Sequence, residues 1–236
     1  MMGSRKVLSR THFLPSIVHE SLLSAQTSNI QLKPRFFPKG LSLLATDVIK
    51  SYFERGSVEE AHILFDEMSD RDVVTWTAMI SGYTSCNQYH RAWTMFCEMV
   101  KAGVEPNAFT MSSILKACKG MKALSCGTLV HGLSIKIGIK GSLYVNNALM
   151  DMYATCCNSM DNACMVFENI NAKNAVSWTT LITGYTHRGD AYGGLGVFRR
   201  MLLEEAELSP FSFSIAVRAC ASIGSDIWGR QVWLYI

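Results

Sequence analysis

Charged residues and long apolar runs are both scarce in this sequence. Of its 236 residues, 17% are charged and 49% are apolar, which is the composition of a folded chain and not of a disordered one. No window approaches the roughly 18 uninterrupted apolar residues that a membrane-spanning helix needs. We therefore predict a folded protein without a membrane partner.

Sequence motifs for catalysis and cofactor binding are also missing. The chain contains no C-x-x-C or H-x-E pair, no P-loop and no G-x-S-x-G motif, and its six histidines form no pattern that suits a metal or a nucleophile. A Gly-rich run at 193–196 falls within a predicted helix and does not follow a strand, as a dinucleotide-binding loop would. We expect no enzymatic activity, no cofactor and no small-molecule substrate.

Eight cysteines are present, and several lie within apolar helical patterns. Because Cys packs as a small apolar residue, reduced and buried thiols are the simplest interpretation. A zinc site built from Cys118, Cys126 and His131 is the alternative, but the spacing of these residues is poor for zinc.

The first 40 residues differ in charge from the rest of the chain. They carry six basic residues and one acid, Glu20, whereas the rest carries 16 basic and 18 acidic residues, so the two parts have net charges of +5 and −2. The body is therefore not broadly basic. A nucleic-acid ligand would have to lie in a local groove and bind with a modest salt dependence.

An amphipathic segment follows the basic residues near the start of the chain. Leu14, Val18 and Leu22 are spaced at i, i+4 and i+8 and give one stripe of a short helix. This pattern is typical of an organelle transit peptide. The alternative is a basic leader that does not target the chain to an organelle. Two prolines in 33–38 bar regular structure there. We interpret residues 1–41 as a transit peptide and linker.

The body of the chain repeats itself at a shift of 102 residues. Trp76 and Thr77 fall on Trp178 and Thr179, and the matches continue over more than fifty residues, which chance does not produce. A fixed period of this kind decides the fold before any local pattern does. Further matches are Ile80, Gly82, Tyr83 and Thr84 with Ile182, Gly184, Tyr185 and Thr186, and Ala117 and Cys118 with Ala219 and Cys220.

The 102-residue period divides into three kinds of unit. Unit 143–174 matches unit 42–72 but has one extra residue near 156–159. The last unit is about eight residues shorter than its counterpart, so we expect the chain to be a truncated member of a longer protein. The predicted units are 42–72, 73–107, 108–142, 143–174, 175–209 and the partial unit 210–236.

Each unit is predicted to be a pair of antiparallel helices. In unit 73–107, the apolar residues of both halves recur at helical spacing, with a turn signal at 85–87 between them and Gly103 at the end. One such hairpin cannot bury its apolar face alone, but stacked hairpins can, which predicts an all-α solenoid with a concave groove. The predicted core residues of this unit are Met79, Ile80, Tyr83, Ala92, Phe96 and Met99.

Three kinds of segment recur in these units. They are V-V-T-W-T-A-M-I-S-G-Y at 73–83 with its counterpart at 175–185, L-K-A-C at 115–118 with V-R-A-C at 217–220, and A-H-I-L-F-D-E-M-S-D-R-D at 61–72. The segments resemble the P-, L- and S-type pentatricopeptide repeats of land plants, and their order is that of the PLS subclass. The resemblance implies a right-handed α-solenoid that binds single-stranded RNA, one base per repeat.

In that family, the fifth and last residues of a unit contact one base edge, and the apolar second residue sandwiches the base between repeats. Short polar side chains can offer hydrogen-bond groups to an unpaired base, and the second and fifth residues share a helix face. The implied base-contact pairs are Thr46 with Asp72 for guanine, Thr77 with Asn107 for adenine, and Asn147 with Asn174 for a pyrimidine. Three further pairs define no base, namely Thr179 with Ser209, Ser112 with Ser142, and Ser214 with a partner past the chain end. The implied sandwich residues are Leu43, Val74, Phe109, Tyr144, Val176 and Phe211.

Two alternatives stay open. Each polar position could cap a helix or form a turn instead, and the solenoid could bind protein, as tetratricopeptide repeats do. The resemblance favours an organellar adaptor for RNA processing or editing, whose partners are single-stranded RNA and editing or processing factors acting in trans. The expected location is the mitochondrion, with the chloroplast as the alternative.

Overall fold

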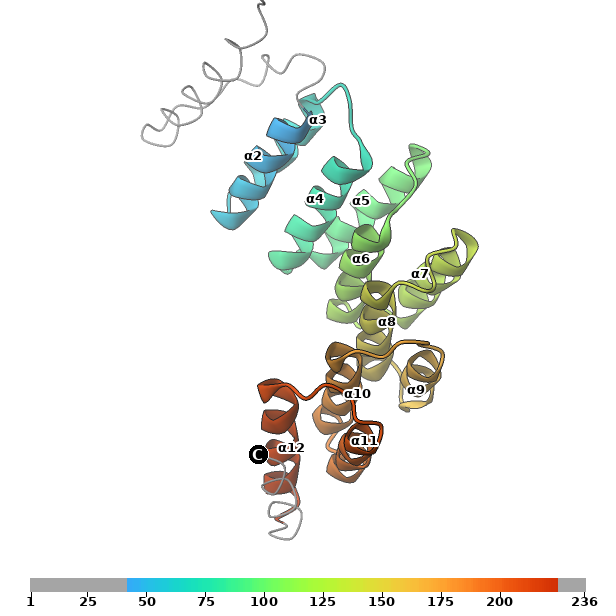
Figure 1. Ribbon diagram of the computed structural model, residues 1–236. Coiled ribbons are helices and arrows are strands. Elements are labelled where there is room, and N and C mark those ends of the chain that lie inside the picture. Colours follow the sequence, from blue (N-terminus) through green and yellow to red (C-terminus); the bar gives the residue numbers. More distant parts are fainter. Residues whose placement is uncertain (1–41, 225–236) are drawn as a thin grey trace, which may run out of the picture. The chain divides into compact units, whose positions relative to one another are not determined.

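The computed structural model describes residues 42–224, and every regular element in that range is an α-helix. The predicted transit peptide and linker, and the last residues of unit 210–236, lie outside the described residues. None of the described helices is both long and apolar enough to cross a bilayer. The helices (Figure 1) are α2 (Ser42–Glu54), α3 (Val58–Glu67), α4 (Val73–Ser85), α5 (Tyr89–Lys101), α6 (Ala108–Gly120), α7 (Leu124–Lys136), α8 (Leu143–Cys156), α9 (Asp161–Glu168), α10 (Ala175–His187), α11 (Ala191–Leu203) and α12 (Pro210–Ser222).

The even-numbered helices form one continuous layer. Each of them packs against the next even-numbered helix, whereas each odd-numbered helix packs against the even-numbered helices before and after it. The odd-numbered helices do not pack against one another within residues 42–224, although side-chain ion pairs join α3 to α5 and α9 to α11. We call the even-numbered helices inner, because they form the continuous layer, and the odd-numbered helices outer. This stack of hairpins is the all-α solenoid that the sequence predicted.

Residues in the left-handed region end several helices. α5 ends at Lys101, and Gly103 follows with a φ of 74°, which glycine adopts at no steric cost because it has no Cβ. Asn87 takes the same conformation after α4, with a φ of 58°. The predicted turn at 85–87 and the predicted end of the second helix are therefore confirmed.

The core lies between the inner and outer helices. An edge-to-face aromatic contact joins each of two outer helices to the next inner helix, and it recurs at the 102-residue period. The ring centroids of Phe65 and Trp76 are 4.7 Å apart and those of Phe167 and Trp178 are 4.8 Å apart, with an interplanar angle of 73° in both pairs. The predicted core residues are confirmed, since Met79, Ile80, Tyr83, Ala92, Phe96 and Met99 are all buried.

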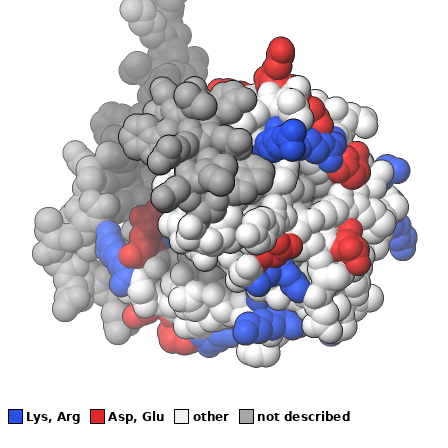
Figure 2. Space-filling view, turned by 90° about the horizontal axis from the view of Figure 1, so that it is seen from below, with Lys and Arg blue, Asp and Glu red and all other residues white. Residues whose placement is uncertain are grey.

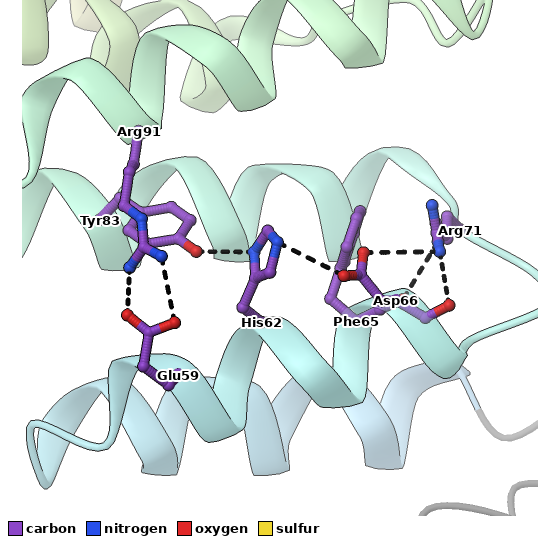
Figure 3. Close-up of polar contacts among 7 residues, drawn as sticks. All are labelled: Glu59, His62, Phe65, Asp66, Arg71, Tyr83 and Arg91. Carbon is purple, nitrogen blue, oxygen red and sulfur yellow. Dashed lines mark hydrogen bonds and ion pairs between the residues drawn. The ribbon is translucent and has the colours of Figure 1, made fainter.

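Polar contacts join the outer helix α3 to the following hairpin (Figure 3). The Tyr83 hydroxyl lies 2.7 Å from Nδ1 of His62, and the Arg91 guanidinium lies over the Tyr83 ring. Arg91 also donates to both carboxylate oxygens of Glu59, and this bonding lowers the pKa of Glu59. Exposed ion pairs of this kind add little to the free energy of unfolding. We therefore interpret these contacts between α3 and the next hairpin as aligning the two hairpins. The same tyrosine position bonds the preceding outer helix as Tyr153 with His131 and as Tyr185 with Cys164.

All eight cysteines are free thiols. Cys118 is buried, and burial raises the pKa of its thiol to about 12. Within the range that the structure describes, no group of three or more His, Cys, Asp or Glu side chains could hold a metal ion. His131, which the sequence offered as a zinc ligand with Cys118 and Cys126, contacts the Tyr153 hydroxyl at 2.8 Å.

Candidate nucleic-acid interface

A row of exposed apolar side chains runs along the inner helices. Single exposed apolar residues are ordinary on a protein surface, but here one stands at the second residue of every inner helix from α4 to α12. A regular apolar set of this kind marks a binding surface. Its members, which we call the apolar row, are Val74 (41% exposed), Phe109 (61%), Tyr144 (65%), Val176 (54%) and Phe211 (60%).

Two members of the apolar row contact each other across neighbouring helices. The ring centroids of Phe109 and Tyr144, on the neighbouring helices α6 and α8, are 5.4 Å apart, and the rings are tilted by 40°. Leu43, predicted for the same row, is the second residue of α2, but its side chain lies outside the described residues.

The last residue of four of the five complete units caps the next inner helix. The side chains of Asp72, Asn107, Asn174 and Ser209 each accept a hydrogen bond from the backbone N–H three residues later. Ser142 stands at the same place before α8, but its side chain makes no capping bond. The helix-cap alternative is thus correct for four of these five residues, and each cap satisfies an N–H group that would otherwise lack a partner in the first turn.

Capping leaves part of each asparagine side chain available. In Asn107 and Asn174, the Oδ1 atom accepts the capping bond, and the Nδ2 group of neither residue bonds any described residue. An amide group carries two donors on Nδ2. The same side chain can therefore start a helix and still offer donors to a ligand.

Buried hydroxyl groups link the two residues of the first two predicted base-contact pairs. The hydroxyl of Thr75 lies 3.0 Å from that of Thr46 and donates to Oδ1 of Asp72 at 2.8 Å. Thr110 stands in the same place one unit later, with its hydroxyl 2.6 Å from that of Thr77 and 3.1 Å from Oδ1 of Asn107.

Thr75 and Thr110 are the third residues of the units that follow these pairs, and both are fully buried. Sequence reasoning did not identify them. The available signal was a hydroxyl residue at the third position of four units, which are Thr75, Thr110, Ser177 and Ser212.

The other fifth residues have no such link within residues 42–224, and two of them bond the backbone of their own helix, as the Thr77 hydroxyl also does with the Val73 carbonyl at 2.6 Å. The Asn147 Oδ1 atom is buried and has no hydrogen-bond partner among the described residues. Thr179 is buried, and its hydroxyl donates to backbone carbonyls of α10. Ser112 bonds the carbonyl of Ala108, whereas Ser214 is exposed. The structure therefore does not bring Thr179 to the surface, and Thr46 is also buried.

The charge distribution around these residues is mixed. In the view of Figure 2, basic and acidic side chains are interspersed, with no broad area of one sign on the visible described surface. This agrees with the near balance of basic and acidic residues beyond residue 40. A row of exposed apolar side chains beside hydrogen-bonding groups is suited to flat polar rings such as unpaired nucleobases.

Models of one repeat family match three stretches of the chain. A model described as a PPR repeat matches residues 46–73 and 176–205, and one described as a PPR repeat family matches residues 71–120. These stretches contain four of the inner helices, α2, α4, α6 and α10, in whole or in large part.

Curated plant proteins are similar over most of the chain. A putative pentatricopeptide repeat-containing protein of Arabidopsis thaliana is 55% identical over 93% of this chain and 36% of its own length. A mitochondrial pentatricopeptide repeat-containing protein of the same plant is 36% identical over 82% of this chain and 30% of its own length. The chain thus spans about a third of the length of these relatives.

A solved structure shares the fold. The crystal structure of the pentatricopeptide repeat protein PPR10 from maize superposes with a TM-score of 0.64 at 21% identity, covering 80% of this chain and 28% of that chain. At this identity the likeness concerns the fold alone, and it agrees with the stacked hairpins described above.

Proposed function

We propose that this chain, whose repeats belong to the pentatricopeptide-repeat family, binds single-stranded RNA along its inner helices. The observation that carries the proposal is the apolar row, which places one exposed apolar side chain at the same position of five successive inner helices. Stacking on such side chains holds unpaired bases of any sequence, because every base has a flat face.

Selectivity in this proposal comes from the residues beside the apolar row. Each unit would contact one base through its fifth and last residues, and Thr77 with Asn107 offers hydroxyl and amide groups to that base. The buried hydroxyl of Thr110 lies between the two side chains and supports their acting on one base. The assignments of guanine, adenine and a pyrimidine to individual units rest on the resemblance to PLS-type repeats.

The wider role that we propose is an RNA-binding adaptor in organelle RNA processing or editing. The described residues offer no metal-binding group and the sequence contains no catalytic motif that we could identify, so catalysis would come from factors acting in trans or from another part of a longer protein. The mitochondrion is the favoured location, since a similar plant protein bears that name, and the chloroplast is the alternative. Imaging a fluorescent fusion of residues 1–60 distinguishes the two.

A protein-binding scaffold is the second candidate function. Apolar side chains are also exposed on the outer helices, Leu129 and Ile135 of α7 among them. In that case the ligand would be a peptide or protein, and replacing polar residues beside the apolar row would leave binding unchanged.

Selection from a randomised pool of single-stranded RNA tests the proposal. The full chain should enrich related sequences from the pool and should leave a duplex RNA of matched length unbound, because the faces of paired bases are stacked within the duplex and cannot meet the apolar row. A folded chain that enriches no sequence would rule out selective RNA binding and would favour the scaffold.

A further inference from the structure

Unit 108–142 lacks the features that join the base-contact residues in the two units before it. Its last residue, Ser142, makes no capping bond. The third residue of the next unit is Val145, which has no hydroxyl to link the pair. This unit keeps the exposed Phe109 of the apolar row, but it is poorly equipped to distinguish bases.

The same unit presents a cation on the inner face. Lys116 lies seven residues after Phe109 and four after Ser112, so the three side chains share one face of α6. Lys116 is exposed and makes no ion pair or hydrogen bond with any residue in 42–224. Arg218 occupies the same position in α12, seven residues after Phe211, and is likewise exposed and unpaired among the described residues.

The equivalent positions of the other inner helices carry no unpaired charge. Ser81 and Thr183 donate their hydroxyl hydrogens to the backbone of their own helices. Lys50 pairs with Asp47 of the same helix at 3.2 Å. Asp151, the one carboxylate among these ninth residues, accepts bonds from Nζ of Lys119 at 2.9 and 2.8 Å.

The surroundings of Lys116 are basic in sequence. Residues 106–150 contain five lysines and no Asp or Glu, although the body of the chain as a whole is slightly acidic. The inner face of unit 108–142 therefore presents an unpaired ammonium group two helical turns from an exposed aromatic ring.

We infer that Lys116, and Arg218 at the matching place of the last unit, bind the phosphate groups of the RNA backbone. In this inference, which rests on the proposed RNA binding, units 108–142 and 210–236 hold the backbone between the units that contact bases. Phosphate is the ligand that suits an unpaired cation set two helical turns from a base-stacking ring, and such a contact is independent of base sequence.

The test compares the salt dependence of binding in matched lysine variants. Lys116→Gln removes the inner-face charge, whereas Lys136→Gln removes an exposed charge from the outer helix α7, and Lys116→Arg keeps the charge. Each variant of the 236-residue chain is titrated into a fluorescein-labelled randomised pool of single-stranded RNA between about 50 and about 200 mM salt. Each phosphate contact contributes about 0.7 to the slope of log Kd against log salt for a single strand.

Lys116→Gln and Arg218→Gln should each lower that slope by about 0.7, so that affinity falls roughly 2- to 3-fold less over this salt range than in the wild type. Lys116→Arg and Lys136→Gln should keep the wild-type slope, and the sequences enriched from the pool should be the same for all variants. Equal slopes for Lys116→Gln and Lys136→Gln would overturn the phosphate assignment while leaving RNA binding intact. A wild-type chain that fails to bind the pool would overturn the proposed function itself.

Discussion

Replacing Gly82 with alanine tests how closely the first two inner helices pack. Gly82 is buried in α4, and an added Cβ would lie 2.1 Å from Cδ2 and 2.4 Å from Cε2 of Phe53 on α2. No real pair of carbon atoms approaches so closely, so the Phe53 ring or the helix must move. Overpacking of this kind costs about 1–3 kcal/mol, and the better helix propensity of alanine returns about 1 kcal/mol. We expect a net loss of up to about 2 kcal/mol.

Gly132 provides a matched control within the same chain. It is exposed in the middle of α7, and an added Cβ would have no neighbouring atom within 4 Å. Gly132→Ala should therefore gain roughly 0.5–1 kcal/mol from helix propensity alone.

Thermal unfolding followed by circular dichroism compares the two variants. One kcal/mol corresponds to about 2–4 °C in a chain of this size, so Gly82→Ala should lower Tm by up to about 8 °C and Gly132→Ala should raise it slightly. Because stability in a repeat array is the sum of local terms, hydrogen exchange should show the loss in α2 and α4. Adding Phe53→Leu to Gly82→Ala should recover part of the loss. If Gly82→Ala raised Tm as much as Gly132→Ala does, the close packing of α2 and α4 would be wrong.

Three further predictions concern the base-contact residues and the half-buried His131. Asn107→Asp keeps a capping oxygen but replaces donors with acceptors, so selection should change from adenine towards guanine at one position of the RNA with little change in Tm; an unchanged selection would remove Asn107 from the interface. Thr110→Val deletes the hydroxyl that links Thr77 to Asn107 and should weaken discrimination at that same position, while Thr110→Ser should retain it. Burial lowers the pKa of His131, so its contribution to stability is complete above the unfolded-state pKa of about 6.5 and declines as the pH falls below it. The Tm of the wild type should therefore drop more steeply on acidification than the Tm of His131→Gln, and parallel curves would contradict this.

Most of the fold could be predicted from the repeat period of the sequence. Because a helical hairpin can bury its apolar face only against its neighbours, matches such as Trp76 with Trp178 were enough to predict the stacked hairpins and the core. Helix ends were also predictable at positions such as Gly103, where the required backbone conformation favours one residue type.

The details of the interface were less predictable. Alignment of the repeats assigned the fifth residue of each unit to the groove. The alignment could not show that Thr46 and Thr179 are buried. Their burial depends on how closely the next inner helix approaches, which is a property of packing between units and not of a single unit. The linking role of Thr75 was hidden for the same reason, because its partners Thr46 and Asp72 lie in the preceding unit.

A pair of tyrosines tests RNA binding by the apolar row most directly. Tyr144 belongs to the apolar row and is 65% exposed, whereas Tyr192 lies on the outer helix α11 and is 67% exposed. Alanine at either site removes the same exposed ring. Loss of one base-stacking ring costs about 1–3 kcal/mol, so Tyr144→Ala should raise the Kd for the RNA selected from the pool by roughly 5- to 100-fold. Tyr192→Ala should leave that Kd unchanged, and equal effects of the two substitutions would contradict binding along the inner helices.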